Sequence, residues 1–452
     1  MSSHNTFNSQ SQSWTDDLPV CKNTGIGFSI NQIYRADGHP QEAHPYEDFT
    51  SNFKFDACDW YAVFDGHEGK KAAEYCSQRM SAEICFSQIE NKTDEEIKEL
   101  LRQAFITVER AYLDTMGEIL AEKTALTWDL PKGKNPYELL SGKPQYNKLA
   151  RLDRELACGT SSAVALIFNN KLYVANVGNC RVLLCQTDQN SVLKVIQLSI
   201  DHDLKNEDEL LRLSQIGINV KKLGPNSSLG NQESTRCLGN YLLKGSYKEY
   251  DILSSATQEP ITAEPDIQSK TLDESCRFLL LMSSGLYKSI EEATGSDQVN
   301  KFIAQCVVEQ FREQSNLTGV AQAVVDKVVH MHRDAYLSKT LDKKCFPKRE
   351  DMTLILRNFN YPLPKAINSP VVTFNPIVTS QIMTDDDREH TLTGTSVNTI
   401  RTNTTSSSEE VLDDEGVGPD QKINAYVDFS EFYNNYMYAR DTGTLPPGLS
   451  LE

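Results

Sequence analysis

Short apolar runs that end at turns alternate with longer stretches of helical spacing between residues 25 and 358. Such runs are typical of buried strands. The pair Asn169-Asn170 separates two of them and predicts a hairpin, because asparagine tolerates the left-handed backbone of a tight turn. The predicted strands cover residues 60–64, 162–168, 171–177, 181–185, 278–282 and 352–356.

Three stretches repeat apolar residues at the three- and four-residue steps of an amphipathic helix. The first runs from Ile97 to Tyr112 and follows Thr93 and Glu96, which have the spacing of a capping box. The other two cover about residues 296–313 and 317–336, whereas residues 123–146 contain Pro and Gly and predict a loop. Hairpin-linked strands and grouped helices do not follow a Rossmann order, so the pattern predicts an α+β fold.

The pattern changes at both ends of the chain. Residues 1–20 predict a flexible segment, residues 21–362 one folded domain, and residues 363–424, rich in Ser, Thr and acids, a disordered linker. Aromatic residues recur at helical spacing in residues 425–440, where an isolated amphipathic helix would be marginal in water. Two interpretations stay open: the helix packs back on the domain, or it docks into a partner's groove, which its aromatic anchors favour.

Composition narrows the range of partners. The net charge is -18, the pI is about 5.0, and no run of five Lys or Arg residues occurs. These features argue against binding to nucleic acid or to anionic membranes. No apolar stretch approaches the about 18 residues of a membrane span, and the N-terminus lacks the apolar core of a signal peptide. The 11 cysteines show no zinc-site spacing. We therefore expect buried thiols in a reducing compartment and a cytoplasmic protein.

These segments together resemble the metal-dependent (type 2C) serine/threonine protein phosphatases between about residues 25 and 358. The resemblance implies a β-sandwich of two antiparallel sheets flanked by helices, with two metal ions at one end. The similar motifs are Ser29-x-x-Gln32-x-Tyr34-Arg35, Glu47-Asp48, Asp65-Gly66-His67 with its turn, Gly159-Thr160-Ser161, Val174 to Arg181, Leu238-Gly239-Asn240 and Glu350-Asp351-Met352-Thr353.

The resemblance also implies a site, of which this sequence keeps one half. In such a site two divalent ions with oxygen ligands share a bridging aspartate and activate a water for attack on phosphorus. Ser284 stands where the family has an acid, Glu350 is one methylene longer than the family's aspartate, and Leu156 replaces another acid. We predict a vestigial phosphatase site without a required cofactor, holding at most one weakly bound Mg²⁺ or Mn²⁺ at Asp65 and Gly66. Its residues are Arg35, which resembles the phosphate-binding arginine, Glu47, Asp48, Asp65, Gly66, Ser284 and Glu350.

A narrower resemblance covers nearly the whole chain. Ser13 to Pro19, Asn169 to Gly178, Asn206 to Leu210 and Tyr426 to Tyr433 are similar to the pseudophosphatase adaptors that bind the TGF-β-activated kinase. One departure is that those adaptors usually lack an intact Asp65-Gly66-His67 motif. The predicted partner-binding residues are Tyr426, Val427, Asp428, Phe429, Glu431, Phe432, Tyr433 and Tyr436.

The narrower resemblance implies a non-catalytic adaptor. Its C-terminal helix would dock on the catalytic domain of that MAP kinase kinase kinase and promote autophosphorylation in stress and innate immune signalling. Its linker would bind a stress-activated MAP kinase, and its globular domain would bind an inhibitor-of-apoptosis BIR domain. Two alternatives stay open: a weak Mn/Mg-dependent serine/threonine protein phosphatase that uses Asp65, Glu47 and Glu350, and a phosphopeptide-binding module that uses Arg35 without hydrolysis.

Overall fold

The computed structural model describes residues 18–35, 40–131, 133–190, 192–224, 227–338 and 348–363, together with Met437. The chain divides into two units, Met1–Val371 and Val372–Glu452, and every element below belongs to the first. The predicted linker beyond residue 363 lies outside the described residues. Apart from Met437, the predicted C-terminal helix lies there too, including all eight of its predicted partner-binding residues.

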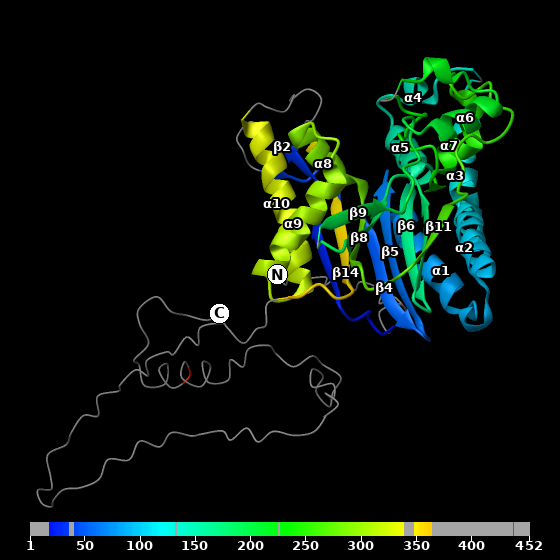
Figure 1. Cartoon of the computed structure of the whole chain (residues 1–452). Coiled ribbons are helices and arrows are strands. Elements are labelled where there is room, and N and C mark those ends of the chain that lie inside the picture. The colour runs from blue at the N-terminus through cyan, green and yellow to red at the C-terminus, as the bar shows by residue number, and fades with distance from the viewer. Residues whose placement is uncertain are drawn as a thin grey trace, which may run out of the picture. The chain divides into compact units, whose positions relative to one another are not determined.

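Two antiparallel sheets form the centre of the described domain (Figure 1). The first has the strand order β1-β14-β12-β8-β9 and the second β11-β7-β6-β5-β4, with β10 beside β6. In the first sheet the strands are β1 (Thr24–Ser29), β14 (Met352–Asn358), β12 (Cys276–Met282), β8 (Arg181–Thr187) and β9 (Leu193–Gln197). In the second they are β11 (Asp266–Thr271), β7 (Lys171–Val177), β6 (Gly159–Phe168), β5 (Cys58–His67), β4 (Phe49–Phe55) and β10 (Leu238–Gly239).

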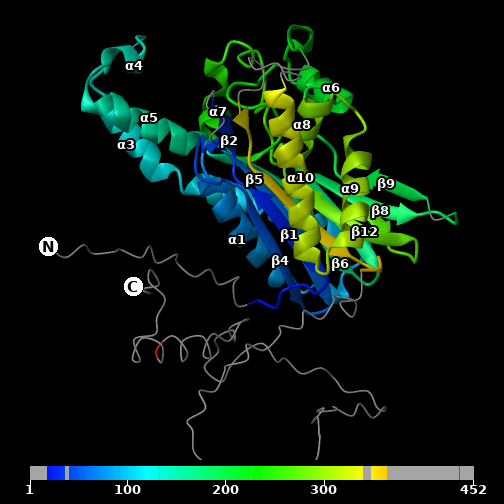
Figure 2. The ribbon, with the colours of Figure 1, turned by 90° about the vertical axis from the view of Figure 1, so that its left-hand side faces the viewer.

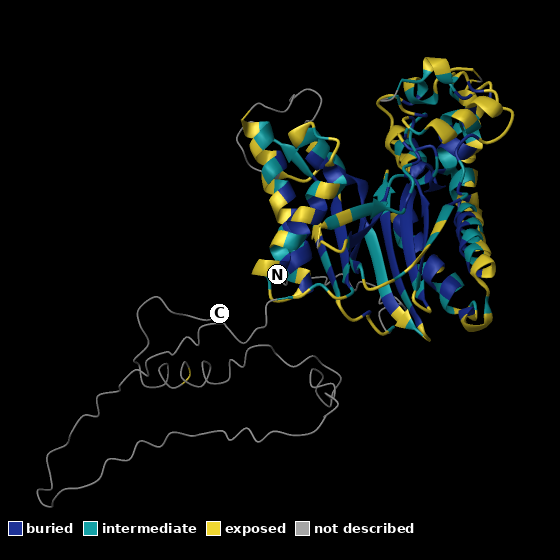
Figure 3. Ribbon diagram, in the orientation of Figure 1, coloured by how far each residue is buried: buried dark blue, intermediate teal, exposed yellow. Residues whose placement is uncertain are grey.

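Side chains from both sheets share one apolar layer. Tyr61, Val63 and Ala165 of the second sheet pack in the same cluster as Leu184 and Leu281 of the first. The two sheets therefore form a β-sandwich, whose strands are largely buried (Figure 3). The predicted α+β architecture is confirmed.

Helices cover both outer faces of the sandwich (Figure 1). On the second sheet lie α1 (Lys71–Cys85) and α2 (Asp94–Asp114); on the first lie α8 (Ser284–Thr294), α9 (Val299–Glu313) and α10 (Leu317–Leu337). Shorter elements are α6 (Glu207–Gln215), α7 (Tyr241–Ser246), the 3-10 helices at Ile89–Asn91, Val220–Lys222 and Tyr247–Glu249, and a small sheet of β13 (Lys348–Arg349), β2 (Gln32–Tyr34) and β3 (Pro40–Gln41). No helix in the described part of the chain is long and apolar enough to cross a membrane.

Two local sequence signals are confirmed and a third is not. The turn at Asn169 and Asn170 joins β6 to β7 with φ of 47° and 57°, and Thr93 forms the capping box of α2. The loop predicted over residues 123–146 is wrong in part, because three helices reach into this region, which extends beside the sandwich (Figure 2). Proline begins the helices there instead of breaking them, since its fixed φ suits the first helical turn. The helices are α3 (Gly117–Thr127), α4 (Pro136–Leu139) and α5 (Pro144–Ala157).

Candidate functional site

Four of the predicted site residues lie at one end of the second sheet. Asp65 and Gly66 belong to β5, which continues to His67, so the turn expected there is in fact the end of a strand. Phe49 of β4 lies opposite Phe64, and the segment that carries Glu47 and Asp48 therefore runs beside Asp65 and Gly66. A Cβ atom on Gly66 would lie 2.4 Å from the carbonyl oxygen of Glu47, so glycine is required for this close approach.

Asp48 is a buried carboxylate with unused acceptor capacity. Its Oδ2 accepts a hydrogen bond from Thr353 Oγ1 at 2.6 Å, whereas its Oδ1 is buried and has no hydrogen-bond partner among the described residues. Burial, together with the nearby charge of Asp65, raises the pKa of Asp48 well above its usual value. Two carboxylates so close in a poorly solvated place require a compensating cation, a proton or several donors.

Asp65 meets the start of α8. The backbone N–H of Ser284 donates to Asp65 Oδ2 at 2.7 Å. Burial raises the pKa of Asp65, although hydrogen bonding from Ser284 and the charge of Lys288 act in the opposite direction. Ser284 therefore offers Asp65 a donor and a neutral hydroxyl, as anion-binding helix N-termini do, but no second carboxylate.

Glu350 and Asp351 diverge, as expected for neighbouring residues entering a strand. The Glu350 side chain is 48% exposed and pairs with Lys348 at 2.8 Å. Asp351 is buried instead, and its carboxylate accepts hydrogen bonds from the backbone N–H groups of Asn31 (2.7 Å) and Glu47 (2.9 Å). Asp351 therefore fixes the chain around the site and does not face Asp65 as a free ligand.

The arginine and the remaining acid of the predicted site lie at its margin. Arg35 follows β2 and is exposed. Glu47 is largely buried, and its Oε1 is 3.4 Å from His44 Nδ1. The buried guanidinium of this region belongs to Arg349, which donates to Ser29 Oγ at 3.0 Å.

Lys288 is a site residue that the sequence reasoning missed. It lies four residues after Ser284 on α8, and residues at this spacing share a helix face. Its Nζ is 2.8 Å from Glu233 Oε2. Burial would lower the pKa of Lys288, but the charges of Glu233, Asp65 and Glu350 outweigh this and raise it, so the ammonium stays charged. The helical spacing from Ser284 was the signal that could have found it.

Residues 114–333 match the protein phosphatase 2C family. The chain carries a protein phosphatase 2C domain. A Caenorhabditis elegans protein named "TGF-beta-activated kinase 1 and MAP3K7-binding protein 1" is 24% identical over 346 residues, which cover 75% of this chain and 82% of that protein. "Protein phosphatase 2C 1" of Paramecium tetraurelia is 26% identical over 250 residues, 55% of this chain and 70% of that protein. The crystal structure of serine-threonine phosphatase 2C from Toxoplasma gondii is 16% identical, with a TM-score of 0.46, and covers 76% of this chain and 98% of that one.

The donor set of this phosphatase 2C domain does not fit two metal ions. Mg²⁺ and Mn²⁺ require several oxygen ligands in near-octahedral geometry. Here one oxygen of Asp65 is taken by an amide N–H, Asp351 is committed to backbone donors, and Lys288 brings a positive charge to the same end of α8. The described part of the chain holds no group of three or more His, Cys, Asp and Glu side chains that could bind a metal ion.

A polar cavity of about 590 Å³ adjoins Lys288 in this phosphatase 2C domain. Arg181 lies over the ring of Tyr287, with 3.6 Å between its Cζ and the ring centroid, and donates to Asp201 at 2.7 Å. Glu233 also lines the cavity. Two ion pairs, Arg181–Asp201 and Lys288–Glu233, therefore lie in its wall.

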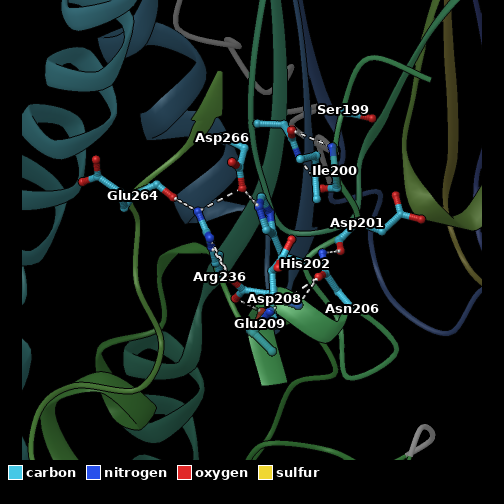
Figure 4. A network of polar contacts seen from close by, with 12 residues as sticks. Ser199, Ile200, Asp201, His202, Asn206, Asp208, Glu209, Arg236, Glu264 and Asp266 are labelled. Carbon is cyan, nitrogen blue, oxygen red and sulfur yellow. Dashed lines mark hydrogen bonds and ion pairs between the residues drawn. The ribbon is translucent and has the colours of Figure 1, made fainter. Parts of the chain in front are cut away.

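A buried ionic network supports the segment 199–206 that lines this cavity (Figure 4). His202 Nε2 is 2.6 Å from Asp266 Oδ2, and Asp266 is 3.2 Å from Arg236 Nη1. Arg236 in turn donates to Glu209 Oε1 at 2.6 Å. The network joins the start of β11 to α6 and so holds the cavity wall in place.

The strand that precedes Arg35 is attached to the rest of the phosphatase 2C domain by a second polar chain. The Tyr34 hydroxyl lies 2.5 Å from Nδ1 of the fully buried His332, whose Nε2 lies 2.8 Å from Glu292. Tyr34 also stacks on Tyr336, with ring centroids 4.3 Å apart. His332 thus links β2, α8 and α10.

We expect His332→Phe to destabilise the domain by about 2 kcal/mol, because the new ring keeps the volume but leaves Tyr34 and Glu292 without their partner. Urea unfolding of the purified chain measures this. His330→Phe is the matched control: His330 is exposed on the same helix, its Nδ1 meets the carbonyl oxygen of Asp326, and the loss expected there is below about 0.5 kcal/mol. Equal losses in the two variants would contradict the assigned linkage.

Proposed function

We propose that this chain is a non-catalytic cytoplasmic adaptor that binds the catalytic domain of a TGF-β-activated kinase and promotes its autophosphorylation in stress and innate immune signalling. The C. elegans relative whose name states that it binds such a kinase supports this proposal, since the similarity spans 75% of this chain. The kinase would bind the predicted aromatic helix of residues 425–440. A stress-activated MAP kinase and an inhibitor-of-apoptosis BIR domain remain further proposed partners.

One observation of the site carries the non-catalytic part of the proposal. The acid Asp65 faces the backbone N–H of Ser284, at the point where hydrolysis by two metal ions requires a further anionic ligand. Lys288 adds a charge of the same sign as a metal ion. A binuclear centre that positions water for attack on phosphorus has too few ligands here.

Kinase activation tests the adaptor function. Co-expression of the kinase catalytic domain with the full chain is expected to give autophosphorylated kinase, and a chain that ends at Pro419 is expected to give neither activation nor co-purification. Within the full chain, the double change Tyr426→Ala and Phe429→Ala should reproduce the truncation because it removes two aromatic anchors. Asn434→Ala, off the predicted aromatic stripe, is the matched control. Activation that survives the loss of Tyr426 and Phe429 would refute the assignment of the kinase-binding segment.

A weak Mn/Mg-dependent phosphatase is the second candidate, supported by the Paramecium relative and the retained Asp65. Hydrolysis of p-nitrophenyl phosphate by the pure chain with millimolar Mn²⁺ discriminates the two. No turnover above an Asp65→Ala variant is the result expected of an adaptor. Turnover that Asp65→Ala abolishes would replace the non-catalytic proposal with the phosphatase.

A further inference from the structure

We infer that Lys288 is the resident cation of the vestigial site, and that its ammonium balances the carboxylate of Asp65, the neighbour of Asp48, and keeps a divalent metal ion out. This inference extends the non-catalytic part of the proposed function. It does not depend on which kinase or other partner the chain binds.

The position of Lys288 follows from the geometry of α8. The first residue of this helix, Ser284, is fixed on Asp65 by a 2.7 Å hydrogen bond. One turn later the same face carries Lys288, whose side chain is two-thirds buried. Its ion pair with Glu233 at 2.8 Å holds the ammonium at the wall of the polar cavity, where the charges of Asp65 and Glu350 also act on it.

The charges at this end of the sheet favour such a cation. Asp48 is buried and has one oxygen without a partner among the described residues. Asp65 is hydrogen-bonded by Ser284, through its backbone N–H at 2.7 Å and through its side chain. Thr353 adds a neutral hydroxyl to Asp48. Neutral donors compensate two neighbouring anions only in part, whereas the ammonium of Lys288 acts on Asp65 with a full positive charge in a poorly solvated place.

The same ammonium opposes a metal ion. A divalent cation on Asp65 would bring two positive charges toward Lys288 with little water between them. Glu233 cannot relieve this repulsion by binding the ion, because its carboxylate is already paired with Lys288. The inference therefore predicts that the charge of Lys288, and not its size, sets the low metal affinity.

Two substitutions separate charge from size. Lys288→Met keeps an aliphatic stem of similar length and removes the charge, and Lys288→Arg keeps the charge. Isothermal titration of the full chain with Mn²⁺ alone is expected to show at least about tenfold tighter binding for Lys288→Met than for the unchanged chain. Lys288→Arg is expected to stay within about twofold. Lys205→Met, a loss of charge on the same cavity wall, should also leave the affinity unchanged.

Thermal unfolding gives a second readout that does not depend on activity. Without Mn²⁺, Lys288→Met should unfold at a lower temperature than the unchanged chain. Millimolar Mn²⁺ should raise the unfolding temperature of the variant and so abolish the difference. Lys288→Gln replaces Lys288→Met if the latter does not fold. Unchanged Mn²⁺ affinity in the charge-removing variant, or equal gains in Lys288→Arg and Lys205→Met, would overturn the inference. Kinase activation by the Lys288→Met variant is measured in the same series. A loss of kinase activation would contradict the proposed adaptor function and not the role of Lys288.

Discussion

Glu209→Gln is expected to destabilise the domain by about 3 kcal/mol, because it breaks a buried ion pair and leaves the cations behind. The Glu209 side chain is 1% exposed and accepts hydrogen bonds from Arg236 (2.6 Å), Arg212 (2.9 Å) and Thr235. Urea unfolding at neutral pH measures the loss. Glu207→Gln, at an exposed position of the same helix, should change the stability by less than about 0.5 kcal/mol.

The pH dependence of stability provides an independent check on Glu209. Burial alone would raise the pKa of this carboxyl, but the hydrogen bonds from Arg236 and Arg212 outweigh it and lower the pKa from 4.5 to about 2. Because the pKa of Glu209 is lower in the folded chain, its carboxylate stabilises the fold fully above about pH 4.5, and this stabilisation is lost as the pH falls toward 2. At about 1.4 kcal/mol per pH unit the loss is about 3 kcal/mol. The difference in the free energy of unfolding between the unchanged chain and Glu209→Gln should therefore shrink over this range. A constant difference would contradict the ion-pairing role assigned to Glu209.

The strands and helices could be predicted from the sequence because their signals are local. The hairpin at Asn169 depends on two adjacent residues, and the helix after Thr93 depends on one capping box and one apolar stripe. The helices of residues 117–157 were missed in part because Pro136 and Pro144 were read as breakers. Proline gives opposite signals at the start and in the interior of a helix, and only the buried leucines of α5 decide between them.

The site was less predictable because its contacts join distant segments. The resemblance to phosphatases pointed to both Asp65 and Ser284. Their spacing of 219 residues, however, does not show that the backbone N–H of Ser284 donates to Asp65. The network of Glu209, Arg236 and Asp266 likewise assembles three separate segments. Lys288 is different, since its place one turn after Ser284 was visible in the sequence.

Gly285→Ala is expected to destabilise the domain by about 3 kcal/mol, because there is no space for a side chain at this position. A Cβ atom at Gly285 would lie 2.0 Å from the carbonyl oxygen of Asp351, which belongs to a backbone segment fixed by hydrogen bonds to its buried carboxylate. The higher helix propensity of alanine would stabilise α8 by about 1 kcal/mol, so net destabilisation means that the steric conflict dominates.

Two control variants make the Gly285 result specific. Gly117→Ala adds a Cβ atom with nothing within 4 Å at the start of α3, and should be neutral or slightly stabilising. Ser284→Ala retains the backbone N–H that meets Asp65, and should cost no more than about 1 kcal/mol. Urea unfolding of the three variants tests the order. If Ser284→Ala costs as much as Gly285→Ala, the hydroxyl of Ser284 has a structural role of its own. If Ser284→Ala costs less, packing alone requires the glycine, and the side chain at residue 284 contributes little to the stability of the fold.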